Sequence, residues 1–70
     1  MAKYLPKQLM VTTNGPIPKK GFNVYATVIT EVSSGSIIFS VYFDNQSDAD
    51  ALSASIARSF QSSADVIEIP

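Results

Sequence analysis

The chain has 70 residues, of which 46% are hydrophobic, and its formal net charge at pH 7 is −1. A chain this short forms a single domain with a marginal core, because a domain of this size buries only about 60% of the surface of its unfolded chain. Cysteine and histidine are both absent, so disulfides and the common nucleophile–base pairs of enzymes are excluded, and a metal site would have only oxygen ligands. We predict a protein that is not an enzyme and binds no cofactor.

The N-terminal third predicts one strand between two irregular segments. Residues 1–7 are predicted as a short arm, and residues 8–13 (QLMVTT) as a strand that ends at the breaker Asn-Gly-Pro. Residues 14–21 are predicted as an exposed loop, because they hold two prolines and two glycines. In that loop, Lys19 and Lys20 are candidates for contacts with a phosphate or an acidic partner, with an ordinary solvated turn as the alternative.

Residues 22–43 predict a central hairpin. Apolar and β-branched residues alternate along 22–32 and again along 36–43, which is typical of strands. A two-residue turn at Ser34-Gly35 would pair Val28 with Val41 and collect most large apolar side chains on one face. A register shifted by one residue would set Val28 opposite Ser40 and mix the two faces. We therefore predict the two-residue turn.

The second face of this hairpin is also rich in apolar residues. In the predicted register it holds Tyr25, Thr27, Ile29, Ile38, Ser40 and Tyr42. A sheet that is wetted on one side carries mostly polar residues there, so we predict that these residues bind a partner. The alternative is that the N-terminal segment, with Tyr4, Leu5, Leu9 and Met10, folds across them.

Residues 47–61 predict a helix. Ser47 is the predicted N-cap, and Ala49, Leu52, Ile56 and Phe60 follow at helical spacing as one apolar stripe. We predict that this stripe covers the hairpin face of Phe22, Val24, Val28, Phe39 and Val41. Helix capping accounts for the nearby aspartates, Asp44, Asp48 and Asp50, whose spacing lacks the glycine and distal glutamate of a calcium loop, so no metal site is predicted. Residues 65–69 predict a last short strand.

The resulting order is strand, strand, strand, helix, strand. It predicts a single α+β domain over residues 1–70, a two-layer sandwich in which an antiparallel-rich sheet carries one helix on one face. No stretch approaches the roughly 18 apolar residues of a membrane span, and residues 1–7 lack the apolar run of a secretory signal. We therefore expect a soluble, cytoplasmic protein that does not associate with a membrane.

These features predict a non-enzymatic protein–protein interaction module that self-associates or binds another protein through the outer sheet face. One alternative is a small viral or phage-type inhibitor or particle component that binds a host protein. Another is single-stranded nucleic-acid binding, with Tyr25 and Tyr42 as stacking platforms and Lys3, Lys7, Lys19 and Lys20 along the phosphates.

The charge distribution bears on these alternatives. Residues 1–30 hold four lysines and no acid, and residues 31–70 hold six acids and one arginine. This asymmetry favours pairing between the halves or between molecules, and a homo-oligomer is expected. The slightly acidic total makes nucleic acid the less favoured partner.

Overall fold

The computed structural model describes residues 2–62 and 66–69. The elements in chain order are β1 (Ala2–Tyr4), the 3-10 turn η1 (Pro6–Gln8), β2 (Leu9–Lys19), β3 (Phe22–Glu31), β4 (Ile37–Phe43), α1 (Gln46–Ser62) and β5 (Ile67–Ile69). Strands β2, β3 and β4 form an antiparallel sheet in that order, and β1 pairs with β5 in a separate two-stranded sheet. The predicted α+β class and element order are confirmed, with β1 as an additional short strand.

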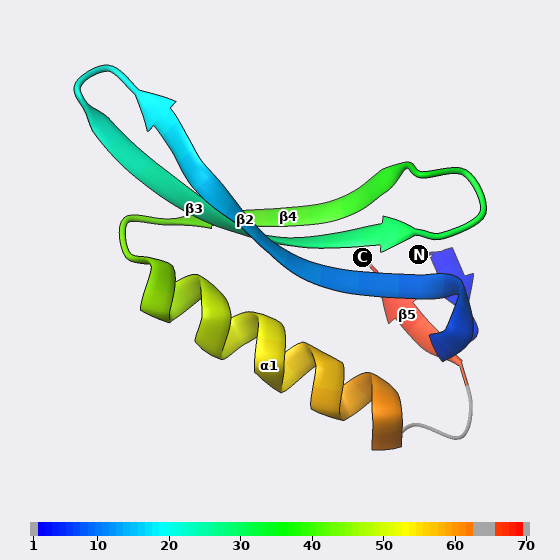
Figure 1. The fold of residues 1–70 in the computed structure, drawn as a ribbon. Coiled ribbons are helices and arrows are strands. Elements are labelled where there is room, and N and C mark those ends of the chain that lie inside the picture. The colour runs from blue at the N-terminus through cyan, green and yellow to red at the C-terminus, as the bar shows by residue number, and fades with distance from the viewer. Residues whose placement is uncertain (1, 63–65, 70) are drawn as a thin grey trace.

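Helix α1 and the β1–β5 pair both lie on one side of the β2–β3–β4 sheet (Figure 1). The core between them is centred on Leu9, Ile29 and Ile69, with Ile56 and Phe60 of the helix packed against it. Burying an aliphatic or aromatic side chain contributes roughly 1.5–3 kcal/mol, which is why this side of the sheet attracts every other described element. The opposite side of the sheet is covered by none of the described elements.

The position of the N-terminal segment answers one question left open by the sequence. Tyr4 packs against the core on the helix side, and β1 is held there by its pairing with β5. Lys3 of β1 stands opposite Glu68 of β5, with Nζ 3.8 Å from Oε1. The alternative in which this segment folds across the predicted outer residues is therefore confirmed for Ile29 and Ile38, which share the core with Tyr4 and Leu9. It is wrong for Met10, which stands opposite Thr30 on the other face of the sheet.

The predicted register of the central hairpin is wrong by one residue. Val28 stands opposite Ser40, and Val41 stands opposite Thr27. The connection is a five-residue loop, 32–36, in which the Glu31 N–H donates to the Ser36 carbonyl. Ile38 is an extra residue, since Ile29 pairs with Phe39 and Thr30 pairs with Ile37. The alternation of apolar residues favoured the other register, but the longer loop and the extra residue at Ile38 set the observed pairing.

The shift decides which face the helix covers. Thr27 and Ile29 lie beneath α1, and their cross-strand partners Val41 and Phe39 share that face. Of the residues predicted to lie under the helix, Phe39 and Val41 do so. Phe22, Val24 and Val28 alternate onto the opposite face, so that part of the prediction is wrong.

Strand β2 continues through most of the segment predicted as an irregular loop. Its pairing with β3 shifts between Asn14 and Ile17 and then runs on to Lys19, and the chain reverses at Lys20 and Gly21. The prediction of an irregular loop over residues 14–21 is thus wrong, although most of these residues are exposed. Prolines are tolerated here because β2 is an edge strand, whose outward side needs no N–H donor.

The helix prediction is confirmed to within one residue at each end. Because α1 begins at Gln46, Ser47 lies inside its first turn, and the predicted N-cap is wrong. The carbonyl of Asn45 accepts the Ala49 N–H at this end of the helix. The last strand is confirmed over Ile67–Ile69, and its predicted start at Asp65 lies outside the described residues.

Candidate functional site

The candidate site is the face of the β2–β3–β4 sheet that lies opposite α1, called here the uncovered face. Cross-strand pairing places the following side chains on it: Met10, Thr12, Asn14, Ile17, Lys19, Phe22, Val24, Ala26, Val28, Thr30, Ile37, Ser40 and Tyr42. The central strand β3 supplies small residues, and the larger side chains stand on the flanking strands and at the strand ends. Val24, Ala26 and Val28 are only 7%, 2% and 3% exposed, because their neighbours on β2 and β4 surround them.

Exposure of large apolar side chains is concentrated on this face. The exposed large hydrophobic residues of the described chain are Leu5, Met10, Phe22, Val32, Ile37, Tyr42 and Val66. Four of these seven belong to the uncovered face, and a fifth, Val32, directly follows β3 in the same alternation. Met10 and Ile37 both stand opposite Thr30 at one end of the face. Phe22 is the partner of Lys19, which lies over Tyr42, towards the other end. Exposed apolar patches of this kind mark sites of interaction.

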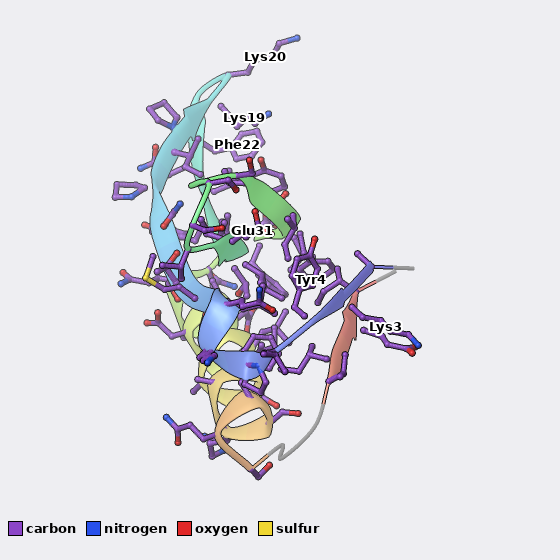
Figure 2. All side chains as sticks on the ribbon, turned by 90° about the vertical axis from the view of Figure 1, so that its right-hand side faces the viewer. Lys3, Tyr4, Lys19, Lys20, Phe22 and Glu31 are labelled. Carbon is purple, nitrogen blue, oxygen red and sulfur yellow. The ribbon has the colours of Figure 1, made fainter. Side chains whose placement is uncertain are left out.

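The positive charge at this face comes from the β2–β3 hairpin. Lys19 Nζ lies 5.9 Å from the centroid of the Tyr42 ring, within the range of a cation–π contact. Figure 2 shows Lys19 and Phe22 close together near the tip of the hairpin, with Lys20 extending beyond the tip. The two predicted lysines therefore differ in setting, since Lys19 belongs to the uncovered face and Lys20 stands free of it.

The predicted partner-binding residues divide between the two faces. Ser40 and Tyr42 lie on the uncovered face. The other four, Tyr25, Thr27, Ile29 and Ile38, lie on the helix side, where Thr27 is 0% and Ile29 is 3% exposed. Their predicted position on one shared outer surface is wrong, and the cause is the one-residue shift in register. Met10, Phe22 and Ile37 are the exposed residues that the sequence prediction missed.

A chain of hydroxyl groups explains why the helix lies on the side of Thr27. Thr13 Oγ1 is 2.8 Å from Ser53 Oγ, Ser53 donates to Thr27 Oγ1 over 3.1 Å, and Thr27 donates to the Ala49 carbonyl over 2.8 Å. If Ser53 gives its proton to Thr27, Thr13 must donate to Ser53. The three hydroxyls then form one directed chain from β2 through the helix to β3. These contacts join residues far apart in the sequence, so no local pattern indicated this packing.

The predicted stacking platform for single-stranded nucleic acid is not formed. Tyr25 pairs with Phe43 on the helix side, whereas Tyr42 pairs with Ala26 on the uncovered face. Lys3 lies on the β1–β5 pair, far from Lys19 and the hairpin tip (Figure 2). The two tyrosines therefore occupy opposite faces, and these two lysines do not lie along one groove.

Residues 2–62 and 66–69 enclose no detected pocket, and they bring together no group of three acidic side chains that could hold a metal ion. Among the described helices, none is long and apolar enough to cross a membrane.

Comparison with known proteins adds no relative. No protein-family model matches the chain, and no curated protein and no solved structure matches it. Its function is therefore inferred from the uncovered face itself.

Proposed function

We propose that the protein is a non-enzymatic interaction module that self-associates through the uncovered face. The observation that supports this proposal is the position of its two most exposed large hydrophobic side chains. Ile37 is 62% and Tyr42 is 58% exposed, and both belong to β4, a strand at the edge of the sheet. An apolar group at a free sheet edge is accessible to another molecule without any rearrangement of the fold.

The energetics favour burial of these side chains in a contact between molecules. Transfer of one such side chain from water contributes roughly 1.5–3 kcal/mol. Tyrosine and methionine, both present on this face, are residue types enriched at protein interfaces. A 70-residue domain also has a small core of its own, and association is one of the usual supports for domains of this size.

The chemistry of the chain agrees with a non-enzymatic role. With no histidine and no cysteine, its nucleophile candidates are hydroxyl groups, and no imidazole is present to activate them. The buried hydroxyl of Thr27 and the part-buried hydroxyls of Thr13 and Ser53 are engaged with one another and with the Ala49 carbonyl. They hold the helix on the sheet.

Sedimentation velocity over a range of protein concentrations tests the proposal. Tyr42→Asp and Ile37→Asp each place a charge on the uncovered face, and we expect either change to weaken self-association by at least roughly tenfold, because a desolvated and unpaired charge opposes contact. Ser55→Asp is the matched control, because Ser55 is exposed on α1, and it should leave association unchanged. A wild-type chain that stays monomeric at every concentration would contradict the proposal, as would equal effects of all three changes.

A further inference from the structure

The outer edge of β4 has no charged residue and no proline to protect it against strand pairing, and the extra residue at Ile38 interrupts it only near its first end. The strand spans Ile37–Phe43 (IIFSVYF). It pairs only with β3, and in the described part of the chain no backbone group of β4 bonds to anything on its other side. Natural sheets usually block such an edge with charges, prolines or a covering element, because free N–H and C=O groups attract another strand.

The other edge of the sheet is protected. β2 carries Pro16 and Pro18, which have no N–H to donate, followed by Lys19. If two copies of β2 were paired antiparallel about their central residue, Asn14, each proline would lie within the paired stretch and deprive it of a donor. The sheet therefore has one edge suited to pairing and one edge that resists it.

We propose that two copies of the chain join by antiparallel pairing of their β4 strands about a two-fold axis at Ser40. This inference rests on the proposed self-association and names β4, the edge strand that carries Ile37 and Tyr42 of the uncovered face, as the joining element.

Pairing about Ser40 sets Phe39 of one copy opposite Val41 of the other, and both side chains lie on the helix side. The extra residue at Ile38 puts Ile37 and Phe43 on opposite faces, so the regular pairing is centred on residues 39–41. Apolar side chains then meet apolar side chains across the axis, which is the favourable arrangement for cross-strand neighbours.

Charge favours a second copy of this chain as the occupant. When a strand pairs with a copy of itself, like charges must not stand opposite each other, and β4 has no charged residue. The first acid beyond the strand, Asp44, lies four residues from the axis. A two-fold contact of this kind is self-complementary, which is the commonest symmetry of soluble homo-oligomers.

The paired sheet has the strand order β2-β3-β4-β4-β3-β2. The two uncovered faces become one continuous surface, with the Tyr42 side chains close to the axis. Both outer edges of this sheet are β2 strands, whose prolines resist further pairing. Growth therefore stops at the dimer, whereas a chain with two unprotected edges would extend into a filament.

Complementary charges at the axis provide a specific test. Ser40 is exposed, so a longer side chain there leaves the monomer fold intact, but in the dimer the two copies of residue 40 are only about 4.5–5.5 Å apart at Cβ. Ser40→Lys alone and Ser40→Glu alone should each weaken dimerisation by roughly tenfold through like-charge repulsion. An equal mixture of the two variants should dimerise more tightly than either one alone. Circular dichroism confirms that each variant is folded.

The outcomes separate this inference from the proposed function. If Tyr42→Asp abolishes a wild-type dimer but the S40K and S40E mixture gains nothing over the single variants, self-association stands and pairing at β4 is overturned. If the wild-type chain does not dimerise, both the proposed function and this inference fail.

Cross-linking gives an independent measure, since the chain has no native cysteine. Mild oxidation should link Ser40→Cys into dimers much faster than Ser55→Cys, and equal rates would count against the axis at Ser40.

Discussion

At the scale of single residues, the hydroxyl of Thr27 lies in the core and depends on hydrogen-bond partners there. It is fully buried, it donates to the Ala49 carbonyl and it accepts from Ser53. Thr27→Val keeps the shape of the side chain and leaves both partners without this bond. We expect a loss of about 1–3 kcal/mol in the free energy of unfolding, the usual cost of a buried unsatisfied polar group. Urea denaturation measures it.

Thr30→Val is the control for this change. Thr30 lies on the same strand, is half-buried on the uncovered face and has no side-chain hydrogen bond to another described residue. Its replacement should change the free energy of unfolding by less than about 0.5 kcal/mol, as is usual away from such features. Equal losses from the two changes would show that the hydroxyl chain contributes nothing.

Substitution of Gly15 on β2 is opposed both by its backbone conformation and by the atoms around it. Its φ is +144°, and a Cβ added there would lie 2.6 Å from Cδ1 of Tyr25. Gly15→Ala should therefore destabilise the fold by about 1–3 kcal/mol, from backbone strain and from displacement of the ring. In the double variant with Tyr25→Ala the collision is removed and only the strain remains. The double variant should lose less free energy of unfolding than the sum of the two single variants, and strict additivity would argue against the contact.

At the scale of elements, the sequence predicts what depends on local pattern. The stripe of Ala49, Ile56 and Phe60 predicted α1 to within one residue at each end, because helical periodicity is a property of the segment itself. The β-branched and aromatic runs predicted β3 and β4 for the same reason. The continuation of β2 through its prolines depends on its place at the sheet edge, which its own residues do not reveal.

Register and face depend on tertiary contacts instead. The five-residue loop and the extra residue at Ile38 set the pairing of β3 with β4, and neither feature follows from the alternation of apolar residues. The decision lay in the contacts between Thr27, Ser53 and Thr13, which join residues far apart in the sequence. As a result, Ser40 and Tyr42 of the candidate site could be predicted, whereas Met10, Phe22 and Ile37 could not.

Close packing of α1 against β3 supports a prediction about the helix. Ala49 is fully buried, and its carbonyl meets Thr27, so the helix backbone can approach the sheet only because this side chain is small. Ala49→Leu should push the first turn away and cost about 1–3 kcal/mol of unfolding free energy, as overpacking usually does. Ala51→Leu, at an exposed position of the same turn, is the control and should be close to neutral. Chemical denaturation of both variants measures the difference, and similar losses would contradict this account of the packing.

At the scale of the whole molecule, one helix and one short strand pair cover one side of a sheet that is apolar on both sides. The buried hydrophobic residues of the described chain are Leu9, Val24, Ala26, Val28, Ile29, Ala49 and Ile69. Three of these seven, Val24, Ala26 and Val28, face the uncovered side. Part of the core is thus shielded only by the side chains around it. A second copy joined at β4 gives new neighbours to Tyr42 and Ser40, which stand opposite Ala26 and Val28, and this links the stability of the fold to association.

This link predicts a melting temperature that depends on protein concentration. If folding and dimerisation are coupled, a roughly hundredfold increase in concentration stabilises each chain by up to about 1.4 kcal/mol through mass action. For a domain of this size that free energy raises the melting temperature by roughly 5–10 °C. Differential scanning calorimetry at about 5 µM and about 500 µM measures the shift for a dimer whose dissociation constant lies below that range. Tyr42→Asp should melt at the same temperature at both concentrations, while Ser55→Asp should shift as the wild type does. Sedimentation could show a dimer whose melting temperature does not change with concentration. That result would mean that the two copies associate without stabilising the fold. The shielding of Val24, Ala26 and Val28 would then be complete within one chain.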